Sequence, residues 1–427
     1  MNWAVGWLAV AMGGCTTPDP TPKPAPSTSA EDELRQQLES LGYIDVSDDA
    51  ADPSQMGVTR HDTAAAWPGH NLYCMKGLAQ ALLLDMDGTV VHQWSPPVDT
   101  GAPTDREWTS CRLANNGDLI VIGVRENTLS KGIHDGLRFI ARYGWDGTER
   151  WRKARVRAHH DSAQLPNGDT LTLQVRYRQV PELDTTAPIR DDLLVRIAPD
   201  GTVVEQHSLL DALRAAPRPL ISRAPEDKWN RVQVDLVHAN TVAPITAAHD
   251  LFSPGQVLIT SRHQHQVFAL DLHTGQVTWA WGPGELRMPH EGAVLDNGNV
   301  LIFDNGDEGR PHSRIVELKP TASGGEVVWS WTADPPSSFH SGSRGGAQRL
   351  PNGNTLVTES NRGHVFELSP AGAIVWEFWN PVLARGDHRR TFRRMERIPL
   401  SLTGPLLNGL VGDTVPPTAP PQAPGTP

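Results

Sequence analysis

One segment, in which two apolar runs flank an Asn-Gly pair, recurs along the chain and limits its fold more than any other feature. It reads MPHEGAVLDNGNVLIFDNG from Met288, and it returns as HHDSAQLPNGDTLTL from His159, CRLANNGDLIVIG from Cys111 and GGAQRLPNGNTLVTES from Gly345. Asn-Gly between apolar runs is typical of a β-hairpin, because both residues tolerate the positive φ of a type I′ turn. Each copy is therefore predicted to be a hairpin, and His290 begins the first strand of its copy.

A second series of hairpins alternates with the first and mostly ends in tryptophan. These outer hairpins end at Trp94, Trp151, His207, Trp281, Trp331 and Trp379, whereas the inner hairpins surround only Asn116-Gly117, Asn167-Gly168, Pro254-Gly255, Asn297-Gly298 and Asn352-Gly353. One inner-plus-outer pair cannot bury both faces of its sheet, so such pairs stack radially as blades. The sequence therefore predicts an all-β fold, a six-bladed β-propeller of four-stranded antiparallel blades.

The first outer hairpin lacks an inner partner before it. Its missing strands come from around Asn71 to Met75 or from the C-terminal stretch Arg390 to Leu400, and we favour a mixed closure that uses the C-terminal stretch. The propeller is assigned to residues 57–400. A long interval between Gly168 and Gly255 predicts an insertion at 208–229 that begins with a short helix in DALRAA.

The N-terminal region is predicted to direct export. Residues 1–14 are apolar and end in small residues before Cys15, which resembles a bacterial lipoprotein signal with lipidation at Cys15, although Lys and Arg are absent before the apolar core. An ordinary secretory signal is the alternative. Residues 15–30 form a Pro-rich tether, 31–56 a helix (29–43) and leading segment, and 401–427 a Pro-rich tail. We expect a cell-envelope lipoprotein, periplasmic or attached to the outer membrane, in which Cys74 and Cys111 could form a disulfide.

Charge and motifs exclude several functions. The net charge is -11 and no basic stripe stands out, so nucleic acid is not an expected partner. The chain contains no G-x-x-x-x-G-K-[ST] phosphate loop and no H-E-x-x-H zinc motif. A quinone-dependent dehydrogenase fits the architecture, but neither paired cysteines nor a cofactor-stacking motif supports it. No cofactor is expected.

Histidines repeat at one register position. Five residues before the turn leucines Leu165 and Leu295 stand His160 and His290, and His238 opens HANTV in the same register. Asn240 lies on the strand face of His238 because side chains alternate with a period of two, and Arg262 ends the next strand. We expect these five residues to meet at one mouth of the central channel. The alternative is that the histidines are independent strand-end residues and that Arg262 forms a salt bridge at the rim.

These residues carry a family resemblance. HHD at 159–161, HAN at 238–240, SRHQ at 261–264 and HEGAVLDNGNVLIFDNG from His290 resemble the bacterial arylsulfate sulfotransferases, which are six-bladed propellers that need no nucleotide cofactor. The segment GVTRHDTAAAWPGHNLYCMKGLAQALLLDMDGTVVHQW from Gly57 is similar as well, so the resemblance covers most of residues 57–400. It implies catalysis through a sulfated histidine at His290, with His160, His238, Asn240 and Arg262 as its partners.

The chemistry suits those residue types. Imidazole is available as a neutral nucleophile near pH 7, and a covalent intermediate divides sulfuryl transfer from an aryl sulfate donor to a phenolic acceptor into two easier steps. Arg262 offers a planar fork to oxyanions, with Asn240 and His238 as further donors. His160 is expected to be the acid–base group at the phenol oxygen. Arg344 and His340 are expected to shape the pocket, and His159 to face away.

Two other interpretations stay open at this point. Several histidines could bind a metal ion, and His263 and His265 are spaced to share a strand face, but few carboxylates accompany them. A non-catalytic propeller lipoprotein that binds a protein or glycan partner is the alternative function, because a fold alone does not define an activity.

Overall fold

The computed structural model describes residues 45–96, 105–125, 138–228, 231–384 and 386–409. Within these ranges the chain is mostly antiparallel β-strand and has two α-helices, which confirms the all-β prediction. The predicted signal (1–14), lipidation site Cys15, tether and 29–43 helix lie outside the described residues. No helix of the described part is both long and apolar enough to cross a membrane.

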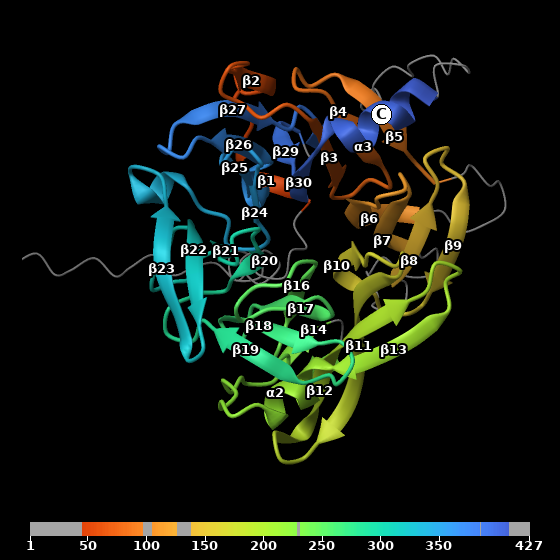
Figure 1. The fold of residues 1–427 in the computed structure, drawn as a ribbon, viewed down its shortest axis with the longest axis vertical. Helices are drawn as coiled ribbons and strands as arrows, with labels where there is room; N and C mark the ends of the chain where they lie inside the picture. Colours follow the sequence, from red (N-terminus) through yellow and green to blue (C-terminus); the bar gives the residue numbers. More distant parts are fainter. Residues whose placement is uncertain (1–44, 97–104, 126–137, 229–230, 385, 410–427) are drawn as a thin grey trace, which may run out of the picture.

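Six sheets of the described chain share one plan, in which four antiparallel strands follow one another from the centre of a ring outward (Figure 1). The first three sheets consist of β30 (Phe392–Ile398), β3 (His70–Met75), β4 (Ala81–Leu84) and β5 (Val90–Trp94); of β6 (Asp105–Leu113), β7 (Leu119–Arg125), β8 (Arg138–Tyr143) and β9 (Glu149–Ala154); and of β10 (His159–Gln164), β11 (Thr170–Val180), β12 (Asp184–Ile197) and β13 (Val203–Ser208).

The other three sheets continue the same order. They consist of β16 (Ala239–Pro244), β17 (Gln256–Ser261), β18 (Gln266–Asp271) and β19 (Val277–Trp281); of β20 (His290–Val294), β21 (Val300–Asp304), β22 (Arg314–Thr321) and β23 (Gly324–Trp331); and of β24 (Gly346–Arg349), β25 (Thr355–Glu359), β26 (His364–Leu368) and β27 (Ile374–Trp379), to which β2 (Gly57–His61) adds an outer fifth strand. The inner and outer hairpins predicted from the sequence are therefore all present.

The remaining elements are short. A small sheet joins β1 (Val46–Ala50), β29 (His388–Arg390) and β28 (Leu383–Ala384), and β14 (Glu226–Lys228) pairs with β15 (Arg231–Gln233). The helices are α2 (Leu209–Ala215), α3 (Leu400–Gly409) and the 3₁₀ turns η2 (Pro336–Ser338) and η3 (Ser360–Arg362).

Both stretches proposed for the missing inner strands are used in one sheet. β30 pairs antiparallel with β3, with His70 opposite Ile398 and Tyr73 opposite Met395. The innermost strands also contact one another in cyclic order, from β6 through β10, β16, β20 and β24 to β30 and back to β6. A C-terminal strand and the first N-terminal hairpin thus complete the same sheet.

The predicted turn type was wrong, although the hairpins are present. In the turn of the β20–β21 hairpin only Gly298 has a positive φ, 81°, and its N–H donates to the carbonyl of Leu295 at 2.8 Å. A type I′ turn needs two positive φ angles, whereas a type I turn followed by a left-handed glycine needs one. The side chain of Asn297 accepts a bond from the N–H of Asn299 at 3.0 Å, which favours the ordinary φ at Asn297.

Apolar side chains fill the space between neighbouring sheets. Ile120 and Ile140 of the second sheet, for example, pack against Leu193 and Ile197 of the third. These contacts bury the faces that one sheet cannot cover alone. Side chains at the inner ends of the sheets are left to line the centre of the ring.

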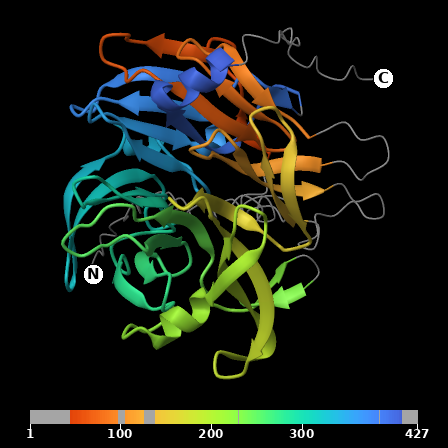
Figure 2. The same ribbon diagram turned by 45° about the vertical axis from the view of Figure 1, so that its right-hand side comes forward.

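Two helices lie at the outside of this arrangement. α2 begins after Ser208, whose hydroxyl accepts from the N–H of Asp211 at 3.0 Å, which confirms the predicted helix at the head of the insertion. α3 lies beside the first sheet in both ribbon views (Figures 1 and 2), and its Leu402 and Leu406 pack on the core between the first two sheets. Residues 401–409, which were assigned to a Pro-rich tail, are therefore helical.

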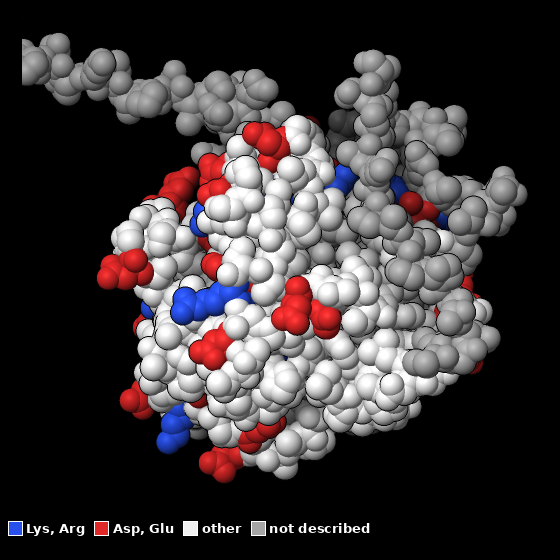
Figure 3. All heavy atoms as spheres, turned by 90° about the horizontal axis from the view of Figure 1, so that it is seen from above, with Lys and Arg blue, Asp and Glu red and all other residues white. Residues whose placement is uncertain are grey.

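Charged groups are dispersed on the face shown in Figure 3, where acidic side chains stand in several separate places and basic ones in a few. This distribution agrees with the net charge of -11.

Candidate active site

Three histidines stand at the heads of the inner strands of three successive sheets. His290 begins β20, His160 is the second residue of β10, and His238 directly precedes β16. His160 and His238 have φ angles of 56° and 47°, which are uncommon for residues with a side chain. The strand register shifts at all three places. These β-bulges redirect side chains at the strand heads, as they often do beside active sites.

The five residues predicted from the sequence lie close together. The His160 and His238 rings have centroids 5.0 Å apart, and the N–H of Arg262 donates to the carbonyl of His238 at 3.1 Å. Asn240 Nδ2 donates to the carbonyl of Pro289, the residue before His290, at 2.9 Å. His290 is within electrostatic reach of Arg262 and His238, because both charges act on its pKa. The geometry thus assembles one cluster, while the role of each member stays a prediction.

Asn305 fixes the proton of His290. Asn305 follows β21 directly, and its Oδ1 lies 2.7 Å from His290 Nδ1. The Asn305 amide donates to the carbonyl of Ser341 at 2.6 Å and to the carbonyl of Arg344, so its oxygen must face the imidazole. His290 Nδ1 is therefore the protonated nitrogen and Nε2 carries the lone pair. Burial, followed by the charge of Arg262, holds the pKa of His290 well below its ordinary value of 6.5, so the ring is neutral at pH 7.

Arg262 is a buried cation without a salt bridge among the described residues, although the charges of Asp235 and Glu226 act on its pKa. Its side chain is 5% exposed, its Nη1 lies 3.2 Å from His263 Nε2, and its Nη2 donates to the carbonyl of Gly342 at 3.4 Å. Its Nε has no hydrogen-bond partner. Burial and the charge of Arg223, opposed by the charges of Asp235 and Glu226, lower the pKa of Arg262 to about 10, so the group stays protonated at neutral pH. A buried guanidinium with an unused N–H is suited to an oxyanion.

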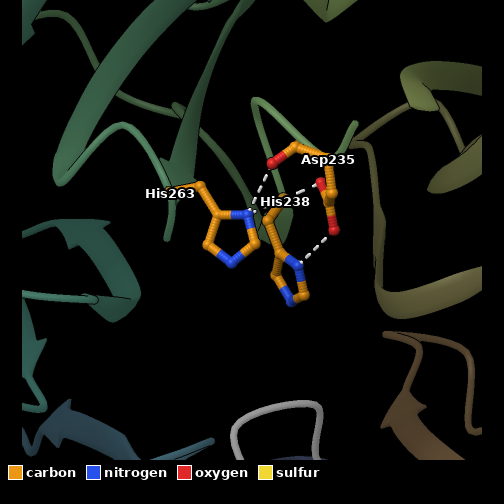
Figure 4. A group of neighbouring side chains, drawn as sticks. All are labelled: Asp235, His238 and His263. Atoms are coloured by element: carbon orange, nitrogen blue, oxygen red, sulfur yellow. Dashed lines mark hydrogen bonds and ion pairs between the residues drawn. The ribbon is translucent and has the colours of Figure 1, made fainter. Parts of the chain in front are cut away.

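Asp235 orients His238 (Figure 4). His238 Nδ1 donates to Asp235 Oδ2 at 2.7 Å, and Arg190 donates to the same oxygen at 2.9 Å. This bond places a proton on Nδ1 and leaves the Nε2 lone pair of His238 free. Burial lowers the pKa of His238 to about 4 against the opposing effect of Asp235. His238 is therefore a second neutral imidazole with a defined tautomer.

Asp235, His238 and His263 also have ligand atoms within 4.8 Å of one another, a spacing that a metal ion could use. The surrounding bonds do not favour a cation. His263 Nδ1 donates to the backbone carbonyl of Asp235 at 2.7 Å, and the guanidinium groups of Arg190 and Arg262 already lie against the carboxylate and the His263 ring. The other histidine of the metal hypothesis, His265, accepts the backbone N–H of Met288 at 3.1 Å. The group therefore fits a hydrogen-bond network better than a metal centre.

The expectation that His159 faces away was wrong. His159 is buried and its Nδ1 lies 2.7 Å from His160 Nδ1, while its Nε2 lies 3.4 Å from Asp192 Oδ1. The two Nδ1 atoms share one proton in this contact, and Arg190 Nη2 lies 3.4 Å from His159 Nε2. Burial, then His159 and His238, hold the pKa of His160 well below 6.5.

A network of ion pairs adjoins the histidines. Asp161 and Glu291, which follow His160 and His290, both bind Arg394 of β30, at 2.5 and 2.7 Å. Arg112 of β6 contacts the same two carboxylates at 3.3 and 3.0 Å. Burial opposes ionisation of Asp161, but Arg112 and Arg394 outweigh it and keep its pKa well below the usual range. The network ties together the inner strands of four sheets.

The other predicted residues are placed as follows. Arg344 does contact the histidine cluster, because its N–H donates to His290 Nε2 at 3.3 Å, whereas His340 is exposed and its backbone N–H donates to Glu359 at 3.0 Å. Cys74 and Cys111 are buried and free, so the suggested disulfide is not formed in the structure. Burial and the neighbouring Cys74 thiol raise the pKa of Cys111.

Sequence reasoning missed Asn305, Asp235 and the contact of His159. Asn305 had a weak local signal, since it is the polar residue in FDNG that directly follows the strand paired with that of His290. Asp235 stands three residues before His238 in DLVH, a spacing that nothing in the strand pattern distinguishes. Their contribution became visible only from the hydrogen bonds.

The fold and the site together define an all-β protein of repeated four-stranded sheets that gathers neutral histidines beside a buried arginine. Residues 141–381 match the sequence profile described as Arylsulfotransferase (ASST), which is more than half of the 427 residues and includes all five predicted site residues. The chain belongs to the arylsulfotransferase family.

Similar solved structures are distant in sequence. A protein of unknown function from Bacteroides caccae is 14% identical with a TM-score of 0.46, covering 77% of this chain and 98% of its own. Virginiamycin B lyase from Staphylococcus aureus is 12% identical with a TM-score of 0.41, covering 77% and 88%. The Myceliophteria thermophila Cps50 (Swd1) β-propeller domain is 10% identical with a TM-score of 0.43, covering 81% and 91%. No curated protein matches the chain.

Proposed function

We propose that the protein transfers a sulfuryl group from an aryl sulfate ester to a phenolic acceptor through a sulfohistidine, without a nucleotide cofactor, and that its fold is a six-bladed β-propeller closed by β30. One observation carries the proposal: Asn305 fixes the proton of a neutral His290 on Nδ1, so that Nε2 carries the lone pair within electrostatic reach of the buried cation Arg262. A nucleophile and an oxyanion site are the two parts that this reaction needs.

In the first half-reaction, His290 Nε2 attacks the sulfur of the aryl sulfate. The N–S bond forms as the S–O bond to the ring breaks, and the electron pair leaves with the phenolate. The sulfuryl oxygens carry negative charge throughout, and Arg262 supplies a guanidinium that stabilises it. The N–H of Arg344, which lies 3.3 Å from Nε2 in the free site, is released as the new bond forms and can turn to a sulfuryl oxygen.

In the second half-reaction, the oxygen of an acceptor phenol attacks the same sulfur. The N–S bond breaks, its electron pair returns to Nε2 of His290, and the phenol proton passes to a base. The sequence assigned that base to His160. The hydrogen bond from His238 to Asp235 favours His238 as this base, because the carboxylate stabilises the imidazolium that forms. The His160 ring lies beside it, with the two ring centroids 5.0 Å apart.

Asn240 takes a different part from the one expected. Its amide donates to the carbonyl of Pro289 and its oxygen accepts from Thr241 at 3.0 Å, while Thr241 in turn accepts the N–H of Glu291 at 3.0 Å. These bonds hold the backbone on both sides of His290. We therefore assign Asn240 to positioning the nucleophile, with one amide hydrogen left for substrate.

We also propose that the protein acts in the cell envelope, anchored through a lipid on Cys15. The support is the apolar segment, small residues and Pro-rich tether of residues 1–30. Cys15→Ser is expected to move the protein from the membrane fraction to the soluble fraction in a fractionated cell. Equal membrane association of both proteins would contradict the anchor.

The function is tested with p-nitrophenyl sulfate and a second phenol. Release of p-nitrophenol should depend on the acceptor, and protein incubated with donor alone should gain the mass of one sulfuryl group, located on His290 by peptide mapping. His290→Ala should lose both signals, whereas His273→Ala, an exposed histidine in the β18–β19 turn, should keep both. An absence of turnover and adduct with every donor tried would favour the non-catalytic propeller that binds an envelope partner.

A further inference from the structure

The insertion between β13 and β16 lines a cavity that has no role in the steps of sulfuryl transfer proposed above. The cavity measures about 320 Å³ and is lined by three arginines, Arg214, Arg218 and Arg223, and by apolar groups that include Leu220 and Leu236. No carboxylate is among its described lining residues. The lining combines guanidinium groups with apolar side chains, which is the composition of a site for a ring that bears an acidic group.

The cavity adjoins the proposed active site through one short segment. Gln264, two residues after Arg262, accepts the N–H of Ile221 at 2.7 Å and donates to the carbonyls of Ile221 at 3.0 Å and Leu236 at 2.7 Å. The insertion is therefore bonded to the turn that carries Arg262. Leu236 also directly follows Asp235, the partner of His238.

The charge of a cavity residue also acts on the residues of the proposed active site. The positive charge of Arg223 acts on the pKa of Arg262, of His263 and of His265, so it stands within electrostatic reach of the sulfuryl site. Arg214 and Arg218 are exposed and extend the positive region outward. In a chain whose net charge is -11, a local group of three arginines without a lining carboxylate is a specific departure from the rest of the composition.

We propose that this cavity is a subsite for the acidic substituent of the substrate, so that the preferred phenols carry a carboxylate on a short arm. The proposal rests on the sulfotransferase function proposed above. Because the carboxylate could belong to the acceptor or to the aryl sulfate donor, both are tested.

The experiment compares each acid with its neutral amide. 4-Hydroxyphenylacetate and 3-(4-hydroxyphenyl)propionate are compared with their amides as acceptors, and the sulfate esters of the same compounds are compared as donors. The wild-type protein should show a kcat/KM higher for the acid than for the amide by roughly three- to tenfold in at least one of the two arms, an effect set by partly exposed charge pairs and reduced by added salt. The double variant Arg214→Gln/Arg218→Gln should lose this preference without loss of activity toward the amides.

Arg60→Gln is the matched control, because Arg60 is exposed on the outer strand β2. It should keep the preference for the acid. Equal kcat/KM for acid and amide in the wild-type protein, or a preference that persists unchanged in the double variant, would overturn the subsite.

A binding measurement separates this proposal from the proposed function. Calorimetric titration with 4-hydroxyphenylacetate needs no turnover. If no sulfuryl transfer is observed, binding that the double variant weakens and Arg60→Gln does not would still support the subsite, whereas equal binding by all three proteins would refute it.

Discussion

The buried charge of Arg262 should lower the free energy of unfolding of the protein. A pKa lowered from 12.5 to about 10 disfavours the charged form by roughly 3 kcal/mol, since one unit of pKa is about 1.4 kcal/mol. Replacing the side chain by methionine removes this cost but also removes its hydrogen bonds to His263 and Gly342, worth about 1 kcal/mol each. We therefore expect Arg262→Met to raise the free energy of unfolding by about 1 kcal/mol while kcat/KM for p-nitrophenyl sulfate falls by a factor of about 10²–10³.

The assay pairs urea denaturation with initial-rate kinetics and includes a buried arginine that is ion-paired. Arg397 Nη1 binds Glu367 at 2.9 Å and both side chains are fully buried. Arg397→Met leaves the buried Glu367 carboxylate without its cation, so it should lower the free energy of unfolding by about 3–5 kcal/mol. The reasoning is refuted if Arg262→Met destabilises the protein as Arg397→Met does, because Arg262 would then have a compensating partner, or if Arg262→Met keeps its activity.

Four further predictions concern the pH dependence, two positioning residues and the ion-pair network. The nucleophile must be deprotonated, and the pKa of His290 lies well below 6.5. We therefore expect kcat/KM to stay level when the pH is lowered from 8 to 6.5 and to fall only at more acidic values. A fall in kcat/KM that begins at or above pH 6.5 would contradict a buried neutral His290. Asn305→Ala should reduce kcat/KM by about 10- to 100-fold, with partial recovery in Asn305→Gln, because Nδ1 loses the acceptor that fixes its proton; an unchanged rate would remove Asn305 from the mechanism. Asp235→Asn should leave the first burst of p-nitrophenol nearly intact but slow sulfuryl transfer to weakly acidic phenols by at least about tenfold. Rapid-quench kinetics would separate the two half-reactions. Equal slowing of both half-reactions would count against His238 as the base. Arg394→Met should cost about 3–5 kcal/mol in urea denaturation, since it leaves Asp161 and Glu291 with fewer partners, and a loss below 1 kcal/mol would show that the network is dispensable.

The sequence predicted the hairpins and the histidine register because both depend on local patterns. Apolar alternation and a glycine in the turn indicate each hairpin, and counting back from the turn leucines placed His160 and His290 correctly at strand heads. The turn type was missed because a side-chain bond of Asn297 decides it. The α3 helix was missed because Gly404 and Pro405 argue against a helix locally, whereas burial of Leu402 and Leu406 against two sheets stabilises it.

The partners of the histidines could not be predicted from the sequence, since they come from residues whose neighbours are set by how the sheets pack against one another. Asn305 contacts His290 across one hairpin, but the orientation of its amide is fixed by the carbonyls of Ser341 and Arg344, which lie in the segment between β23 and β24. Arg394 binds Asp161 only because the C-terminal strand returns to the centre of the ring. Such bonds span up to 233 residues of sequence, and no periodic pattern records them.

The tautomers have a chemical consequence that depends on all of these partners. His238 and His290 each have Nδ1 engaged, by Asp235 and Asn305, so each has an unprotonated Nε2. In the proposed mechanism such a site supplies nucleophile and base readily but holds few protons for a leaving group. The first half-reaction then depends on the stability of the departing phenolate, helped by the nearby cations, and the second depends on removal of the acceptor proton by an imidazole of low pKa. Acidic phenols satisfy both demands, which limits the chemistry to aryl esters over alkyl ones because alkoxides leave poorly without protonation.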